Sequence, residues 1–317
     1  MRIPVLTAVA SCVCCGVAVG QTSLVDSVSE ARFLSALYQT PLATQSFSAP
    51  TVAAWDAAGR HAVTNTGVMP ANPVVPMDHV EAWCSFEQAG AGSLLRSYTR
   101  ASGYYMDGGT DGLGTFAMTT IDVRNRITVT NNSGQAVRVE ILELSHGTVM
   151  TGGFSAPMQA DAREELTVLG VGTDPFSYFE HSSAHVYAPE HTPRVELNGA
   201  WQTQSSPITA TIPDLAGTLD GVEVHALNVI SLFTLAAGGT RDFDVTFQGA
   251  YRSMVTGGFL GFAQTDFSGT GTMDYRGVDP VSGQPVAGVS FEVVGVPAPA
   301  GVCVVIAAAL RGGRRRR

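Results

Sequence analysis

The stretch that decides the fold is RITVTNNSGQAVRVEIL, residues 126–142. Val137, Val139 and Ile141 alternate with charged residues, so a strand here presents one apolar face and one polar face. The preceding RITVT is also typical of a strand, and NNSGQ between the two is rich in turn-forming residues. The stretch therefore predicts two strands paired around a turn.

Two further segments repeat this pattern. VISLFTL and DFDVTFQ flank AAGGTR, and TMDYRGV and VAGVSFEVV flank DPVSGQP. Short alternating strands separated by turns, with no helices between them, favour an all-β fold, an antiparallel β-sandwich of jelly-roll-like arrangement. The predicted core positions are Val137, Val139, Ile141, Phe243, Val245, Phe247, Phe291 and Val293.

Three segments leave the organisation of this β body open. LVDSVSEARFLSALYQ (24–39) has both helical and strand spacing, and its serine content favours a strand. MPANPVVPMD (69–78) has three prolines and is either a linker or a long edge loop. TGGF occurs at 151–154 and again at 256–259, so one sandwich, two subdomains and a duplication are all considered.

Charge and cysteine use narrow the classes of partner. The chain has 18 basic residues, all arginine, and 27 acidic ones. Six of the arginines lie near the ends, which leaves 12 against 27 in the body, a net charge of −15. Such a body repels phosphate backbones, so no nucleic-acid partner is expected. Cys84 is the single cysteine outside the terminal apolar segments, and we expect it to be a small buried side chain.

The N-terminus has the pattern of a secretory signal peptide over residues 1–20. Arg2 precedes the apolar run IPVLTAVASCVCCGVAVG, and small residues lead to a predicted cleavage between Gly20 and Gln21. A lipoprotein signal ending at Cys12 is the alternative, although its apolar run is shorter. The sequence therefore predicts an exported protein.

The C-terminal segment, VPAPAGVCVVIAAALRGGRRRR, covers residues 296–317. Its eleven apolar or small residues, 300–310, form too short a helix to span a bilayer, which needs about 20. Pro297 and Pro299 prevent the helix from extending backward. The arginines that follow hold the end at the cytoplasmic face: Arg311, Arg314, Arg315, Arg316 and Arg317. We expect transient membrane contact followed by processing.

This order of prolines, short apolar transmembrane-type helix and terminal arginines resembles the PEP-CTERM sorting signal. Val296, Pro297 and Pro299 match its first part, and Ala298 stands where the signature has an acidic residue. The resemblance implies a bacterial protein handled by the export machinery and an exosortase-like enzyme. It also implies a location at the cell surface or in an extracellular matrix, with extracellular polysaccharide as a partner. The predicted organisation is a signal peptide (1–20), a body (21–295) and a sorting segment (296–317).

Residues 176–201 contain the candidate ligand-binding side chains. His181, His185, His191 and Glu180 are residue types that bind zinc. We expect His181 and His185 to lie on one face only if this segment is a helix. The simpler alternative to a metal site is that the histidines are solvated side chains in a loop. Tyr178, Tyr187 and Trp201 form a second candidate set, for stacking on sugar rings, against core packing.

No catalytic motif accompanies these residues. The chain has no G-x-S-x-G elbow, no H-E-x-x-H and no P-loop, and without lysine it has no Schiff-base chemistry. A pair of carboxylates distant in sequence would leave no motif. We therefore expect a non-enzymatic surface or matrix protein without a cofactor. The alternative is a secreted carbohydrate-binding or metal-dependent protein that uses residues 176–201.

Overall fold

The protein is all-β, with antiparallel sheets, as its sequence predicts. The computed structural model describes residues 23–35, 41–48, 54–55, 61–69, 79–103, 113–153, 158–172, 175–188, 194–199, 201–203, 208–211, 218–255 and 261–294. Within these ranges every regular element is a strand, and no helix is long and apolar enough to cross a membrane. The predicted signal peptide, the sorting segment and their helices lie outside the described residues.

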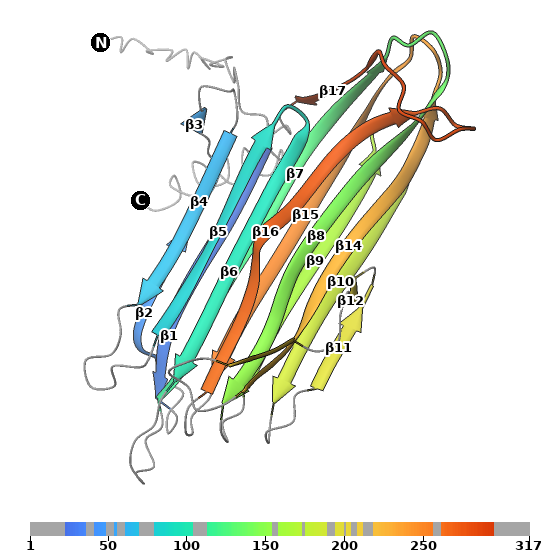
Figure 1. Cartoon of the computed structure of the whole chain (residues 1–317). Coiled ribbons are helices and arrows are strands. Elements are labelled where there is room, and N and C mark those ends of the chain that lie inside the picture. Colours follow the sequence, from blue (N-terminus) through green and yellow to red (C-terminus); the bar gives the residue numbers. More distant parts are fainter. Residues whose placement is uncertain are drawn as a thin grey trace, which may run out of the picture.

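The strands form two sheets (Figure 1). Sheet A has the order β11-β10-β9-β15-β7-β1-β2, and β17 also pairs with β7. Its strands are β1 (Ser23–Ser35), β2 (Pro41–Ser48), β7 (Leu113–Asn131), β9 (Met158–Gly170), β10 (Ser177–Ala188), β11 (Arg194–Asn198), β15 (Thr240–Val255) and β17 (Val289–Val294).

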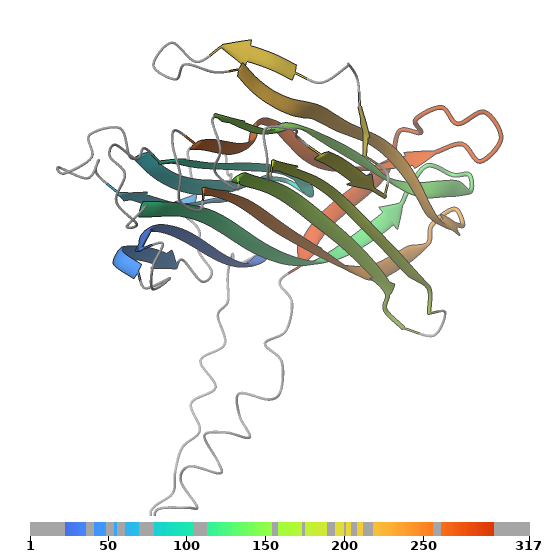
Figure 2. The same ribbon diagram turned by 90° about the horizontal axis from the view of Figure 1, so that it is seen from below.

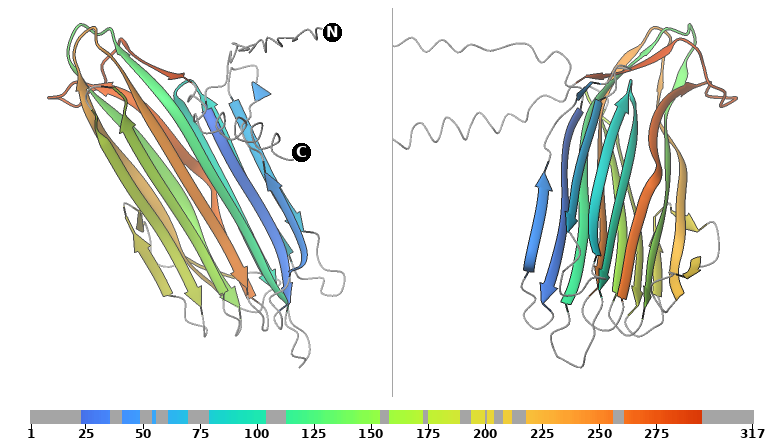
Figure 3. Two further views of the ribbon diagram at one scale, coloured as in Figure 1. Left: turned by 180° about the vertical axis from the view of Figure 1, so that it is seen from behind. Right: turned by 60° about the vertical axis from the view of Figure 1, so that its left-hand side comes forward.

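Sheet B has the order β12-β14-β8-β16-β6-β5-β4-β3, and β13 also pairs with β14. Its strands are β3 (Ala54–Trp55), β4 (His61–Met69), β5 (His79–Ala89), β6 (Gly92–Gly103), β8 (Val137–Gly153), β12 (Gln202–Thr203), β13 (Ile208–Thr211), β14 (Thr218–Leu235) and β16 (Gly261–Val278). Sheet B lies in front in Figure 1, and sheet A lies in front in the left view of Figure 3.

The two sheets form two layers, which Figure 2 shows from below. Their buried apolar side chains meet between these layers. Strand alternation explains this, because every second residue of β8, β9 and β15 is buried. Seven of the eight predicted core residues are buried, and Phe291 packs against them while partly buried. Cys84 is also buried, as predicted.

Of the two ambiguous N-terminal segments, one contributes a strand and the other lies between two paired strands. Residues 24–39 contribute β1, so the preference for a strand was correct. Met69 and Val80 face each other in the pairing of β4 with β5. The proline-rich segment between them therefore connects neighbouring strands of sheet B. Residues 70–78 themselves lie outside the described ranges.

The three predicted strand pairs are not hairpins. Each pair consists of one strand in sheet A and one in sheet B: β7 with β8, β14 with β15, and β16 with β17. The connecting segments 132–136, 236–239 and 279–288 therefore pass from one sheet to the other. Each of these strands pairs with strands distant in sequence, such as β7 with β15 over sixteen residue pairs.

Asn131 ties these connections together at one end of the sheets. Its buried side-chain amide donates hydrogen bonds to the carbonyl oxygens of Gln135 (2.7 Å), Leu235 (3.1 Å) and Ala236 (3.0 Å). Its Oδ1 atom accepts from the backbone N–H and the hydroxyl of Ser133. The side chain therefore satisfies the carbonyls of two connections at once, and the turn role predicted for NNSGQ is confirmed.

The backbone at the same place completes the junction. Asn131 exchanges hydrogen bonds with Gly238 and Gly239, at 2.8 and 2.9 Å. The N–H of Asn132 donates to the carbonyl of Gly288, at 2.8 Å. Gly238 (φ 71°) and Gly288 (φ 85°) adopt left-handed backbone conformations that favour glycine.

Small hydroxyl side chains replace apolar ones in part of the interior. Ser97 of β6 and Thr119 of β7 share a hydrogen bond of 2.5 Å between the sheets. Thr99 and Ser253 share another, of 2.7 Å, and all four residues are fully buried. Because each hydroxyl has a partner in the opposite sheet, these pairs link the layers without leaving an unsatisfied group.

β1 and β17 lie end to end along the same side of β7. Ser23 pairs with Asn125, and Val294 pairs with the adjacent Arg126. The first and last residues of the described structure are therefore neighbours on one strand. We call the strands from Ser23 to Val294 the two-sheet body.

Candidate functional site

The predicted metal ligands lie on strand β10, which separates them. His181 and His185 are partly exposed on the outer face of sheet A, while Ser182, Ala184 and Val186 between and after them are buried. The expectation that they need a helix to share a face was wrong, because residues four apart on a strand also do so, about 13 Å apart. That spacing is too long for one metal ion. Glu180, at the alternate position, faces the interior instead.

Each histidine has a carboxylate partner on β9, so neither is a loop histidine. His185 Nδ1 contacts Asp161, which also accepts hydrogen bonds from Arg252. His181 Nδ1 lies 3.4 Å from Glu165 Oε1, an ion-pair distance without hydrogen-bond geometry.

The described residues contain no group of three or more ligands placed to hold a metal ion. His191 lies outside these residues.

The three predicted stacking residues point to different places. Trp201 is buried and stacks on Phe267, with ring centroids 5.2 Å apart. Tyr178 packs against the core and donates a hydrogen bond to Glu180. Tyr187 stacks on His185. They form no common platform for a sugar ring, and core packing accounts for Trp201.

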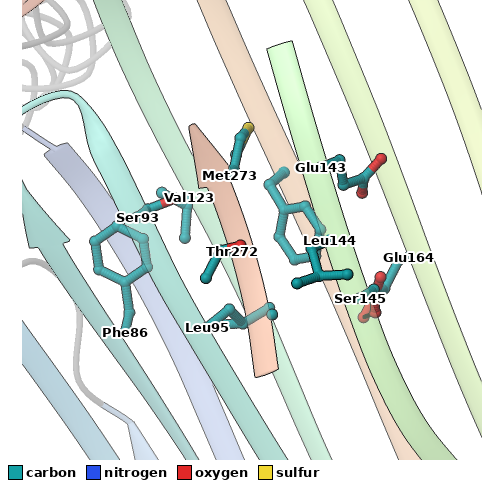
Figure 4. A pocket seen from close by; sticks show the side chains of 12 residues that line it. Phe86, Ser93, Leu95, Val123, Glu143, Leu144, Ser145, Glu164, Thr272 and Met273 are labelled. Atoms are coloured by element: carbon teal, nitrogen blue, oxygen red, sulfur yellow. Dashed lines mark hydrogen bonds between the residues drawn. The ribbon is translucent and has the colours of Figure 1, made fainter. Parts of the chain in front are cut away.

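Three glutamates at the alternate, inward positions form a cluster that the sequence analysis missed. Glu143 of β8, Glu164 of β9 and Glu180 of β10 all face the space between the sheets. Glu164 is almost fully buried at 6 % exposure, and Glu143 is nearly so at 9 %. Figure 4 shows the carboxylates of Glu143, from sheet B, and Glu164, from sheet A, among the side chains that line one cavity. We call these three residues the carboxylate cluster.

Neutral donors hold this cluster. Glu164 Oε1 accepts from the hydroxyl groups of Tyr251 (2.5 Å) and Ser145 (3.2 Å). The side-chain amide of Asn228 donates to Glu180 Oε1 (2.6 Å) and Glu143 Oε2 (3.3 Å). Because β14 carries Asn228 and β10 carries Glu180, this amide joins sheet B to sheet A.

Burial without a positive partner changes the protonation of the cluster. Desolvation raises the pKa of Glu164 to about 8, opposed by the hydrogen bond from Tyr251. Desolvation and the negative charge of Glu180 raise the pKa of Glu143 to about 7. Burial, followed by the hydrogen bond to Glu180, also raises the pKa of Tyr178. At neutral pH the cluster therefore holds protons that ordinary surface glutamates have lost.

The cavity beside the cluster limits the chemistry it can perform. Its volume of about 30 Å³ has room for roughly two water molecules at most. Apolar side chains, including Phe86, Leu95 and Met273, form much of its wall. A sugar or peptide substrate does not fit into a volume of this size.

The strand pattern contained a signal for this cluster. Glu143 is in phase with Val139 and Ile141, and Glu164 is in phase with Ala160 and Ala162. Period-2 alternation extended through each strand places these acids on the buried face. Attention to apolar positions alone did not reveal them.

No protein-family model matches this chain, and a search of curated proteins finds no relative.

Proposed function

We propose that the chain is an exported, non-enzymatic β-sandwich of jelly-roll-like type, displayed at the cell surface or in an extracellular matrix. Its C-terminal segment acts as a PEP-CTERM-like sorting signal, processed by an exosortase-like enzyme. The observation that carries this proposal is the meeting of Ser23 and Val294 on β7. The segments proposed to be removed both continue from this one place.

This arrangement suits removal of both segments. Ser23 and Val294 are held by pairing with β7, so cleavage before Ser23 and after Val294 leaves every described strand in place. The small cavity at the carboxylate cluster supports a non-enzymatic role, because it has no room for a substrate.

Mass spectrometry of the protein recovered from its host tests the processing. We expect a mature C-terminus between Val296 and Pro299 and an N-terminus at Gln21. An intact end at Arg317 in the surface-displayed form would contradict processing.

Substitution of the terminal arginines tests the sorting signal directly. Replacing Arg314 to Arg317 with serine should abolish surface display and leave an unprocessed precursor in the cell. The matched control is Arg163→Ser, which removes an exposed arginine from the outer face of sheet A. Normal display of the tail variant would show that the arginines have no sorting role.

One observation favours carbohydrate binding as a second candidate function. A hollow of about 350 Å³ lies on the outer face of sheet A, and Asp122, Arg163, Glu165 and Gln248 line it. Its size is in the range of small-molecule sites, and its carboxylate, guanidinium and amide groups suit sugar hydroxyls. Saturable retention on the host's own polysaccharide, lost in Gln248→Ala, would support this role. Equal elution of the unaltered protein and the Gln248→Ala variant would exclude carbohydrate binding at this hollow.

A further inference from the structure

Half of strand β14 has an unpaired edge in the described structure. β8 pairs with one side of β14 over Leu219–Leu235. On the other side, β13 pairs with residues 218–221 and β12 with residues 224–225. From Ala226 to Leu235 no described strand occupies that side, as the upper right of Figure 1 shows.

Sheet A has a free edge at the same place. β11 pairs with residues 183–187 of β10, and Gly199 lies against His181 and Ser182, so no described strand covers residues 177–180 on that side. The hydrogen bond between Asn228 and Glu180 shows that the two free segments lie opposite each other. Both sheets therefore end there without a covering strand.

The free segment of β14 lacks the features that protect natural edge strands. Its sequence, ALNVISLFTL, contains no charged residue, no proline and no glycine. Leu227 and Val229 point outward, and their side chains are 65 % and 50 % exposed. One register shift lies between Ser231 and Phe233, so residues 226–231 form its regular part. Natural edge strands of this length usually carry lysines, prolines or inward charges that prevent pairing with another chain.

We propose that residues 226–230 pair antiparallel with the same residues of a second copy of this chain, about a twofold axis. A twofold axis centred on Asn228 brings Leu227 opposite Val229 of the second copy, and the reverse. Two exposed apolar side chains of each copy are then covered by cross-strand contacts. This inference concerns the two-sheet body and is independent of the proposed sorting.

The lack of charge at this edge allows a second copy to approach it. The body carries a net charge of −15, so two copies repel each other across most of their surfaces. The segment 226–230 brings no charge to the contact, and its exposed Leu227 and Val229 cover each other across the twofold axis. A five-residue edge is smaller than a standard interface. We therefore expect a reversible dimer whose population rises with protein concentration.

Sedimentation equilibrium of the full-length protein, at concentrations up to roughly 1 mM, tests the proposal. We expect a monomer–dimer equilibrium. In Leu227→Lys or Val229→Lys, two like charges meet at the paired edge, and dimerisation should weaken at least tenfold. Both side chains are exposed, so the variants should fold, and circular dichroism checks this.

Val281→Lys is the matched control, because Val281 is a 97 % exposed apolar residue in the 279–288 connection. It should dimerise like the unaltered protein. A monomer at all concentrations would overturn the proposal. So would association that persists unchanged in both the Leu227→Lys and Val229→Lys variants, since another surface, such as the apolar tail, would then be responsible.

Discussion

Asn131 shows how one polar side chain can determine where a strand ends. A strand that leaves one sheet for the other exposes carbonyl groups that the sheets no longer satisfy. The side-chain amide of Asn131 donates hydrogen bonds to carbonyl oxygens of two connections. Its Oδ1 atom accepts a hydrogen bond from the backbone N–H of Ser133 in the first of them. Although Asn131-Asn132-Ser133 matches a glycosylation sequon, its amide nitrogen is fully engaged and buried in the folded body.

Replacing Asn131 should therefore destabilise the body strongly. In Asn131→Ala, three carbonyls lose their donor within a buried junction, at a cost of about 2–4 kcal/mol in the free energy of unfolding. Urea unfolding followed by circular dichroism measures the loss. Asn132→Ala is the control, because Asn132 is exposed and should change stability by less than about 0.5 kcal/mol. Equal effects of the two substitutions would show that the junction does not depend on this side chain.

The buried carboxyl group of Glu164 should make the stability of the folded protein depend on pH. Its pKa is about 8 in the folded protein, above the ordinary value of 4.5 that we expect after unfolding. Between these values the folded state binds more protons, so its contribution to stability is fully present below pH 4.5. That contribution is lost as the pH rises through about 8. A shift of this size corresponds to roughly 5 kcal/mol.

The variant Glu164→Gln keeps a neutral side chain of the same shape and should remove this dependence. We expect it to be more stable than the unaltered protein at pH 9 and similar to it at pH 5. Thermal unfolding across this range measures the difference. Glu165→Gln, one residue away on the outer face, should leave the profile unchanged. Parallel profiles for all three proteins would show that Glu164 is not the titrating group.

At the scale of the strand, alternation decides which substitutions are tolerated. Val245 of β15 is buried, while its neighbour Thr246 points to the outer face of sheet A, opposite Arg124 of β7. Val245→Asp buries an unpaired carboxylate, which costs several kcal/mol. That is comparable with a total stability of about 5–15 kcal/mol, so we expect the variant not to fold.

Thr246→Asp is the matched variant for this strand. It introduces the same charge one residue later, beside the Arg124 guanidinium, and it should fold normally. Expression in the soluble fraction and circular dichroism distinguish the two variants. A folded Val245→Asp protein would contradict the assignment of this face to the core.

Alternation predicted the strands well but not their partners. A hairpin and a connection between two sheets both bury the same alternate residues, so Val137 and Phe243 satisfy either arrangement. The contacts that choose between them, such as those of Asn131 with residues 235 and 236, are distant in sequence. For the same reason, the sequence pattern favoured a loop for His181, which lies on β10, and could not pair it with Glu165 of β9.

The carboxylate cluster was missed for a related reason. No single strand contains more than one of its members. Glu180 stood out only beside the histidines of its own strand, and Glu143 and Glu164 appear in the sequence as ordinary polar positions. The pairing of β9 with β10 and the facing of β14 bring them together. Only the tertiary arrangement makes Asn228 their common donor.

At the scale of the whole molecule, the strands and hydrogen bonds near the two TGGF motifs can be compared. β7, β8 and β9 occupy sheets A, B and A, while β14, β15 and β16 occupy sheets B, A and B. Each TGGF is followed at the same spacing by Gln and Asp, which also share a hydrogen bond in both places: Gln159 with Asp161 (3.1 Å) and Gln264 with Asp266 (3.5 Å). Duplication remains a hypothesis, and this correspondence identifies the two units to compare.

The meeting of Ser23 and Val294 has a consequence for the chain as a path through space. β17 and β1, with six and thirteen residues, together match the nineteen residues of β7. Their pairings with β7 continue without a gap, from Asn131–Arg126 to Asn125–Leu113. The backbone path from Ser23 to Val294 therefore closes on itself, except for one break between two half-strands beside β7.

The two ends of this path can be joined at the break, and new chain termini can be made in another connection. We expect a circularly permuted protein, with Val294 bonded directly to Ser23 and new ends between Gly90 and Ala91, to fold into the same two sheets. Its β17 and β1 become one uninterrupted strand, so it should unfold at a higher temperature than a permutant whose junction contains a long Gly/Ser linker. A direct junction that is less stable than the linked one would show that the two half-strands are not in line.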